Sequence, residues 1–221
     1  MKTNNLIRTV VAVLVLLVLV TATTAALDAT ITQVNGKVEI RERTGSPWTA
    51  VETGAVVPVG ATISTSFNSS ARIQLGESVV EVKALTRMAI EELVTQAGVD
   101  QTSINLPIGR ISADVRSTSG KRAEFRVRSP IATASVRGTS FDFDGANLTV
   151  AQGVVLLANR FNEAVGVAAG EQSSAAGTAP PQPPASAAED AGRVTISIGP
   201  GGLPIIRSGT GNVTINWRIV D

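Results

Sequence analysis

The sequence predicts an all-β protein, and two observations carry that prediction. From Ala29 onward, runs of alternating apolar and polar residues recur about every ten residues, with turns rich in glycine between them. The composition is 43% hydrophobic but only 3% aromatic, so Val, Ile, Leu and Ala must fill the core, which favours β strands. This spacing is typical of a barrel, a sandwich or a solenoid.

The first 26 residues have the pattern of a signal peptide. Lys2 and Arg8 precede the apolar run Val10–Val20, and small residues follow as far as Ala26. The run is about half the roughly 20 residues that a membrane-spanning helix needs. We therefore expect cleavage, a periplasmic or secreted protein, and membrane contact only through an uncleaved signal.

Charge and residue usage restrict the functional classes. Without the first 26 residues, 17 basic residues face 18 acidic ones, a net charge of −1 that gives no argument for nucleic acid as a partner. The chain has no Cys and no His. Disulfides, Ser-His-Asp or Cys-His catalysis, and zinc or haem sites built on His or Cys are therefore excluded, and we expect no cofactor and no metal.

The first half of the chain predicts a series of strands. Asn35-Gly36 is a hairpin signal between strands at 29–34 and 37–41. Leu85–Leu93 fits either a helix or a strand, and its neighbours favour a strand. Thr95–Ser103 is expected to be a polar connection. The other expected strands of this half are 55–59, 62–66, 71–75, 78–82, 108–115 and 123–128.

The stretch Ser129–Phe143 is interpreted as strand, tight backbone feature, strand. Pro130 forces an extended start, because its ring disfavours the helical region for the preceding residue. Gly138 is placed where a bulge or a close backbone approach is expected. Beyond it, Phe141 and Phe143 should share one face of a strand.

The same rhythm continues with expected strands at 147–150, 153–158 and 164–167. An Ala/Ser/Pro-rich segment then predicts a disordered linker, and Val194–Ile198 with Val213–Ile219 predict a short β-hairpin. The expected organisation is a signal peptide at 1–26, a β domain at 27–172, a linker at 173–191 and a β tail at 192–221.

The Pro-x-Ala-x-Ala-x-Val-Arg-Gly-Thr-x-Phe pattern from Pro130 to Phe141 resembles the signature of the FecR domain, the periplasmic part of transmembrane regulators of iron uptake. Other parts of the chain resemble the family in the family's order. These are Gly36–Val38, Trp48, Gly54, Gly60, Ile63–Thr65, Ala71–Leu75, Gly109–Ile111, Gly153–Val155 and Ala169–Glu171. The resemblance covers about Ala29 to Gln172.

The resemblance implies an elongated, solenoid-like roll in which Pro130, Gly138, Thr139 and Phe141 form the structural signature. One departure from the family is informative, because only Met1–Thr9 precede the apolar run. Nine residues are too few for an anti-sigma segment. We therefore expect a stand-alone exported module without the transmembrane signalling role.

Three arginines are the candidate binding residues. Arg126 and Arg128 share one strand face, in a segment rich in basic residues that could attract an anionic polymer, or that could simply be a solvated face. Arg137 is a candidate recognition residue, or else it holds a carbonyl or an acid within the fold. Asp142, Asp144 and Asn147 resemble a fragment of a calcium loop, for which turn capping is the simpler interpretation.

The resulting functional hypothesis is a non-catalytic, FecR-like binding module of the bacterial envelope. Its expected partner is an envelope protein or an anionic cell-wall glycan. The alternatives are a regulatory sensor that passes an envelope signal to a separate membrane partner, and a structural envelope protein. A hydrolase built on Glu91 and Glu92, or on Asp142 and Asp144, is disfavoured, because neighbours on a strand do not form a cleft pair.

Overall fold

The computed structural model describes residues 29–117, 120–175, 178–186, 195–198 and 204–207. Across these ranges the regular structure consists of β strands and contains no helix, so the predicted all-β class is confirmed. It follows that no helix within them has the length and apolar character to cross a membrane. The predicted signal peptide, residues 1–26, lies outside the described residues.

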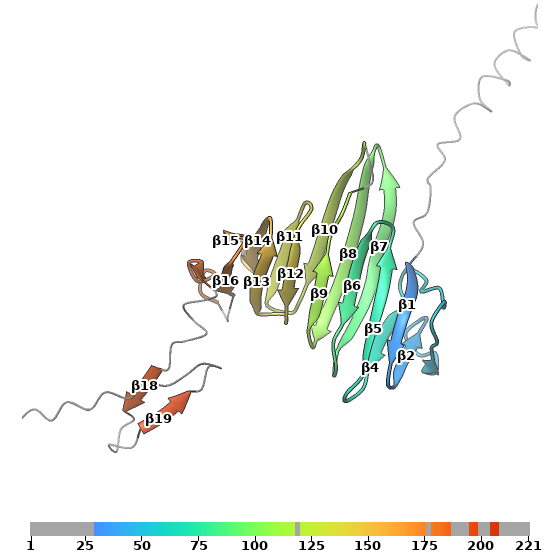
Figure 1. The fold of residues 1–221 in the computed structure, drawn as a ribbon, viewed down its shortest axis with the longest axis horizontal. Helices are drawn as coiled ribbons and strands as arrows, with labels where there is room; N and C mark the ends of the chain where they lie inside the picture. The colour runs from blue at the N-terminus through green and yellow to red at the C-terminus, as the bar shows by residue number, and fades with distance from the viewer. Residues whose placement is uncertain (1–28, 118–119, 176–177, 187–194, 199–203, 208–221) are drawn as a thin grey trace, which may run out of the picture.

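Two sheets contain most of the strands (Figure 1). The eight-stranded sheet has the order β1 (Ala29–Asn35), β5 (Ser70–Leu75), β6 (Ser78–Val82), β9 (Ile111–Asp114), β12 (Ser140–Phe143), β13 (Asn147–Gln152), β16 (Glu171–Ser174) and β17 (Ala185–Ser186). The nine-stranded sheet has the order β15 (Ala164–Ala168), β14 (Val154–Asn159), β11 (Ala132–Val136), β10 (Arg122–Arg128), β8 (Val99–Ile108), β7 (Arg87–Gln96), β4 (Thr62–Thr65), β2 (Val38–Arg41) and β3 (Thr49–Ala50).

The chain fills both sheets progressively. In the eight-stranded sheet the spatial order of the strands is the order of the sequence, and in the other sheet only β2 and β3 depart from it. The chain passes repeatedly from one sheet to the other, as the colours of Figure 1 show. Because β9 lies in the opposite sheet, β8 and β10 become parallel neighbours. Successive segments of sequence therefore occupy successive positions along the molecule.

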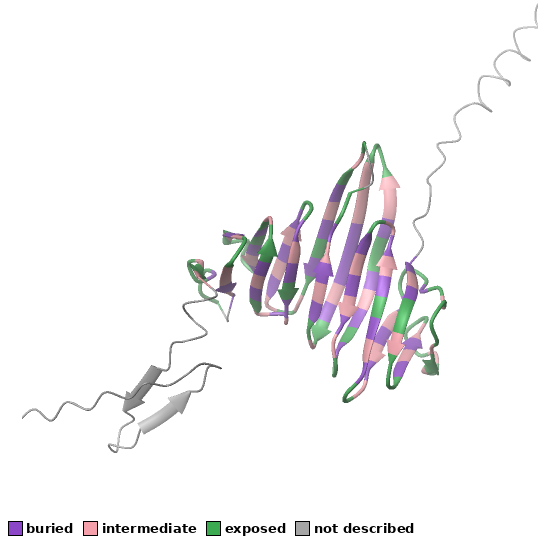
Figure 2. Cartoon of the chain, in the orientation of Figure 1, coloured by how far each residue is buried: buried purple, intermediate pink, exposed green. Residues whose placement is uncertain are grey.

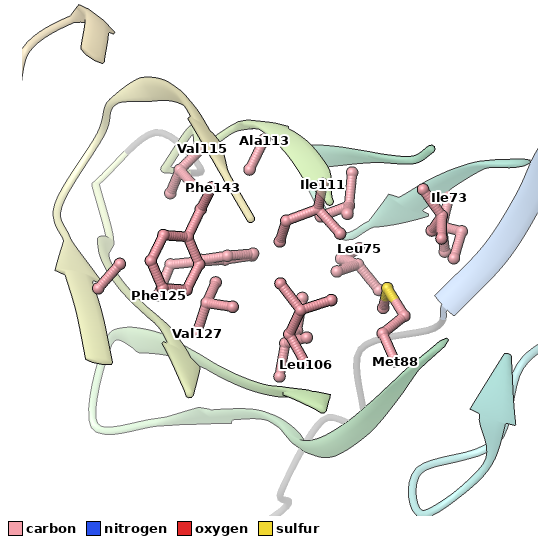
Figure 3. Close-up of a cluster of buried hydrophobic side chains, with 14 of the residues drawn as sticks. Ile73, Leu75, Met88, Leu106, Ile111, Ala113, Val115, Phe125, Val127 and Phe143 are labelled. Atoms are coloured by element: carbon pink, nitrogen blue, oxygen red, sulfur yellow. The ribbon is translucent and has the colours of Figure 1, made fainter. Parts of the chain in front are cut away.

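The hydrophobic core lies between the two sheets. Burial alternates along most strands, as the stripes in Figure 2 show, because neighbouring side chains point to opposite faces of a sheet. In Figure 3, Ile111 and Phe143 from the eight-stranded sheet meet Met88, Leu106 and Phe125 from the nine-stranded sheet. Leu106 is 1% exposed, and Met88, Ile111 and Phe143 are fully buried.

The predicted hairpin at Asn35-Gly36 is wrong. The turn itself is present, and Gly36 has φ +72°. However, β1 pairs with β5 and β2 pairs with β4 and β3, so the turn leads the chain from one sheet to the other. Both strands bury one face against the core between the sheets, and pairing with distant strands satisfies their backbone groups.

The prediction of a strand at Leu85–Leu93 is confirmed, since β7 includes most of this segment. The polar connection predicted at Thr95–Ser103 is wrong. These residues form the ends of β7 and β8, which pair as a hairpin around Ala97-Gly98. Their polar side chains misled the prediction because residues 95–101 of these strands are not buried, although Thr102 and Ser103 are.

The predicted linker at 173–191 contains ordered structure where it is described. Ser173 and Ser174 belong to β16, and Pro181 is buried. The backbone N–H of Gln182 donates to the Ser174 carbonyl oxygen at 2.8 Å, and the hydroxyl of Ser173 donates to the Gln182 carbonyl oxygen at 2.6 Å.

In the predicted tail, β18 (Thr195–Ile198) pairs in antiparallel fashion with β19 (Pro204–Arg207). The second strand predicted there, 213–219, lies outside the described residues.

Candidate binding groove

The signature stretch forms a corner between the two sheets. β11 ends at Val136, residues 137–139 bend, and β12 begins at Ser140 in the opposite sheet. Gly138 has φ +81°, and a Cβ added there would meet nothing within 4 Å. Glycine is therefore needed for its backbone conformation, whereas the bulge or close approach expected from the sequence is not what this position shows.

The other signature residues support this corner. Thr139 is 2% exposed, and its hydroxyl donates to the Val154 carbonyl oxygen at 3.1 Å. Pro130 lies in the turn between β10 and β11, so the strand begins two residues later than expected, at Ala132. Phe141 is 2% exposed and packs edge-on against Phe125, with ring centroids 6.4 Å apart. The side chains of Thr139 and Phe141 are therefore buried away from any ligand, whereas Pro130 is exposed.

The three candidate arginines lie on the outer face of the nine-stranded sheet. Arg126 and Arg128 alternate along β10 with the buried Phe125 and Val127, and Arg137 follows β11. Arg137 Nη2 lies 3.3 Å from Glu124 Oε1, and Arg128 Nη1 lies 3.9 Å from Glu91 Oε2. These pairs are exposed, so each contributes little to stability.

Most of the basic strip predicted between Arg110 and Arg137 is neutralised by acids. Its ion pairs are Arg110–Asp144, Arg116–Asp114, Lys121–Asp100, Arg128–Glu91 and Arg137–Glu124. Arg122 and Arg126 are the two members of this strip whose side chains have no hydrogen-bond or ion-pair partner among the described residues. The surface therefore presents isolated positive charge at particular points instead of a continuous basic band.

Arg126 lies in a surface groove of about 360 Å³. The pairing of the strands places five groove residues in one row across the sheet, since each is the partner of the next. In order they are Glu92 on β7, Ser103 on β8, Arg126 on β10, Ser135 on β11 and Leu156 on β14. The pair Arg137–Glu124 and the side chain of Val154 also line the groove.

The groove combines charged and apolar groups that are open to solvent. Glu92, like Arg126, is exposed, and its side chain has no hydrogen-bond or ion-pair partner within the described part of the chain. Val154 is 60% exposed and Leu156 50% exposed. Ser135, a small side chain, separates Arg126 from Leu156 and leaves room above the sheet. The arrangement can hold a ligand that carries both charged and apolar groups.

The sequence prediction found Arg126 and Arg137, considered Glu92 only as an acid of a disfavoured hydrolase, and missed Val154 and Leu156. A signal for the last two was present. The apolar run Val154–Leu157 alternates between exposed and buried positions, so two of its side chains must point outward from the sheet. Apolar residues at outward positions of a half-exposed sheet are a signal for binding, but only once the strand and its faces are known.

The candidate calcium-loop fragment is a capped turn. Asp144 Oδ1 accepts hydrogen bonds from the backbone N–H groups of Ala146 at 3.1 Å and Asn147 at 2.8 Å. Partial burial raises the pKa of Asp144, but these hydrogen bonds and the nearby Arg110 outweigh it, so the pKa is lower than usual. Within the described residues, no three acidic side chains converge as a metal site would require.

In comparison with protein families, residues 61–156 match the family described as "FecR protein". This segment, less than half of the chain, is similar to a FecR domain. The matched segment includes the signature corner and all five residues of the groove row. It is shorter than the range over which the sequence resembled the family, 29–172.

Among solved structures, the chain is similar to two crystal structures of a candidate anti-sigma factor from Parabacteroides distasonis ATCC 8503. Each is 19% identical, with a TM-score of 0.46, and the similarity covers 57% of this chain and 59% of the other. The chain thus matches less than two thirds of those structures. No curated protein matches the chain.

Proposed function

We propose that the FecR domain is a non-catalytic binding module of the bacterial envelope and that the groove on the nine-stranded sheet holds its partner. The observation that carries this proposal is Arg126, an exposed arginine without a partner in the described chain, beside the exposed Val154 and Leu156. Unpaired charge next to exposed apolar side chains is typical of an interaction site. Arg137 and Arg128 contribute from the edges of this surface.

The proposal includes export. The pattern of residues 1–26 supports a signal peptide and a periplasmic or secreted location. The chain-ordered topology of the two sheets supports an elongated, solenoid-like roll, which presents a long outer face to a partner. A partner protein fits this surface better than an anionic glycan, because acids neutralise most of the basic strip.

A second candidate function is regulatory. The match to the FecR family supports a signalling module that passes an envelope signal to a separate membrane partner. This function would use the same groove. The two functions differ in one outcome. If the protein signals, substitutions in the groove should change the response of the cell to the envelope signal as well as the binding of the partner.

Catalysis is not part of the proposal. Of the acids considered for hydrolysis, Asp142 accepts a hydrogen bond from Ser112, Asp144 caps its turn, and Glu91 accepts one from Ser103. The fourth acid, Glu92, has no side-chain partner in the described chain, but it follows Glu91 on the same strand and so does not form a pair across a cleft, as a glycosidase would need.

The test is capture from envelope extract and sedimentation with peptidoglycan, using the full-length chain. Arg126→Glu and Leu156→Asp should reduce capture of the partner at least about five-fold, because the first reverses the free charge and the second places a carboxylate in the apolar part. Arg122→Glu is the matched control, since Arg122 is exposed on the same strand but does not line the groove. Equal capture by all four proteins would refute the groove as the binding site.

A further inference from the structure

The spacing of the groove row specifies what kind of partner segment it fits. Neighbouring strands in a sheet lie about 4.8 Å apart. Glu92 and Arg126 are separated by two strand steps, and so are Arg126 and Leu156. The row therefore presents an acid, a base and an apolar side chain at intervals of about 9.6 Å.

An extended peptide in the polyproline II conformation has a matching repeat. It has three residues per turn and rises about 3.1 Å per residue, so its side chains at i, i+3 and i+6 share one face at intervals of about 9.3 Å. A regular β strand fits less well, because residues three apart point to opposite sides. The match extends over the whole row, from β7 to β14.

The geometry points to a peptide segment of a partner protein, bound across the strands in an extended, polyproline II-like conformation. Its central residue, at i+3, is acidic and pairs with Arg126. A basic residue three positions away in one direction pairs with Glu92, and an apolar residue three positions away in the other direction covers Leu156 and Val154. This inference rests on the proposed function and names the chemistry of the partner for the same groove.

The electrostatics of the groove favour this ligand over a polyanion. Arg126 attracts a carboxylate, but Glu92 lies two strands away without a partner in the described chain, and Glu124 lines the groove as well. A glycan with repeated negative charges would meet these acids, and like charges placed close together oppose binding. A segment with alternating signs leaves both free side chains paired.

The partner need not order its own backbone to bind. A polyproline II segment is already extended in solution, so little conformational entropy is lost. The small side chains of Ser103 and Ser135 leave room for such a chain between Glu92, Arg126 and Leu156, and Ser103 is only 6% exposed.

The experiment uses two synthetic peptides of the same composition and the full-length protein. The first, Lys-Pro-Pro-Glu-Pro-Pro-Leu, places the acid in the centre, and the second, Glu-Pro-Pro-Lys-Pro-Pro-Leu, places the base there. Because the second peptide has the base in the centre in either chain direction, it cannot satisfy the row. At low ionic strength the first peptide should bind at least about five-fold more tightly, as measured by calorimetry or fluorescence anisotropy.

A charge-swapped protein supplies the decisive comparison. Glu92→Arg combined with Arg126→Glu exchanges the two free charges without changing the apolar part, and should reverse the preference so that the second peptide binds better. Arg122→Glu, outside the groove, should keep the original preference, and circular dichroism would verify the fold of each variant. Equal binding of both peptides, or a preference that the swap leaves unchanged, would overturn the inference.

Failure of the inference is distinguishable from failure of the proposed function. If neither peptide binds but capture of the envelope partner still depends on Arg126 and Leu156, the groove is a binding site for a different chemistry. If peptidoglycan sedimentation depends on Arg126 while the peptides do not bind, the partner is a glycan. If capture is indifferent to the groove variants, both proposals are wrong.

Discussion

At the scale of single residues, two glycines show that the same residue type answers different needs. Gly138, in the family signature, has φ +81° and open space around it. Gly109 has φ +102°, and a Cβ there would lie 2.4 Å from the Cα of Thr86. Gly138 therefore allows the backbone to bend, whereas Gly109 allows its own backbone and that of Thr86 to lie close together.

The lowered pKa of Asp144 predicts that the stability of the protein depends on pH. Its pKa is lower in the folded protein than in an unfolded chain, so its contribution is present above the unfolded pKa, about 3.9, and is lost as the pH falls through the folded pKa. Asp144→Asn should reduce the free energy of unfolding at pH 7 by on the order of 1 kcal/mol. The difference between the two proteins should shrink toward zero in acid, because a protonated Asp resembles Asn.

The measurement is urea denaturation of both proteins at several pH values between 7 and 2. Comparing the variant with the unmodified protein isolates Asp144 from Glu81 and Asp114, whose pKa values are also lowered. A difference that stays constant across this range would show that the charge of Asp144 does not stabilise the turn.

At the scale of elements, each strand separates two tasks. On β10, Phe125 and Val127 point into the core, and Arg126 and Arg128 point outward. On β14, Val155 and Leu157 point inward, and Val154 and Leu156 point outward. The period of two that builds the core thus also places the groove residues on one outer face.

Phe143 on β12 tests how strongly the two sheets depend on their shared core. Phe143 is fully buried, so Phe143→Ala should destabilise the protein by about 3–5 kcal/mol through lost burial and a cavity. Phe67→Ala is the matched control, since Phe67 is 72% exposed and its change should stay within about 0.5 kcal/mol. Thermal and urea denaturation would measure both, and similar losses would contradict the assignment of the core.

At the scale of the whole molecule, residues 178–186, which the sequence predicted to be part of a linker, pack against the C-terminal strands of the domain. The Asn159 amide Nδ2 donates to the Ala179 carbonyl oxygen at 3.0 Å, Gln182 bonds to Ser173 and Ser174, and β17 pairs with β16. Covering a strand edge in this way protects it from pairing with other chains.

Truncation of the chain would test how much residues 178–186 stabilise the domain. A chain ending at Ala175 loses β17 and the hydrogen bonds to Ala179 and Gln182, so it should be less stable by on the order of 2–3 kcal/mol and should aggregate more readily. A chain ending at Ser186 keeps them and serves as the control. In the described chain β18 and β19 pair only with each other, so this control should differ little from the full-length protein.

The melting temperatures of the three chains, with light scattering to follow aggregation, test this prediction. Equal melting of the two truncated chains would show that residues 178–186 do not stabilise the domain.

Much of the local structure was predictable from the sequence, because the determinants are close together in the chain. Alternation of apolar and polar residues gave the strand at Leu85–Leu93 and the shared face of Phe141 and Phe143, since the side-chain period of a strand is two. The same period placed Arg126 and Arg128 on one face. The pattern around Gly138 pointed to the FecR family, which the match over residues 61–156 bears out.

By itself, then, the sequence determined the fold class, the positions of most strands and the similarity of residues 61–156 to the FecR family. The tertiary structure decided which strands pair, and there the Asn35-Gly36 hairpin failed, because pairing with β5 and β4 depends on residues far along the chain. It also decided the groove. Glu92, Arg126 and Leu156 lie 64 positions apart from first to last in the sequence, and only the sheet, whose strands join them in one row, makes them neighbours.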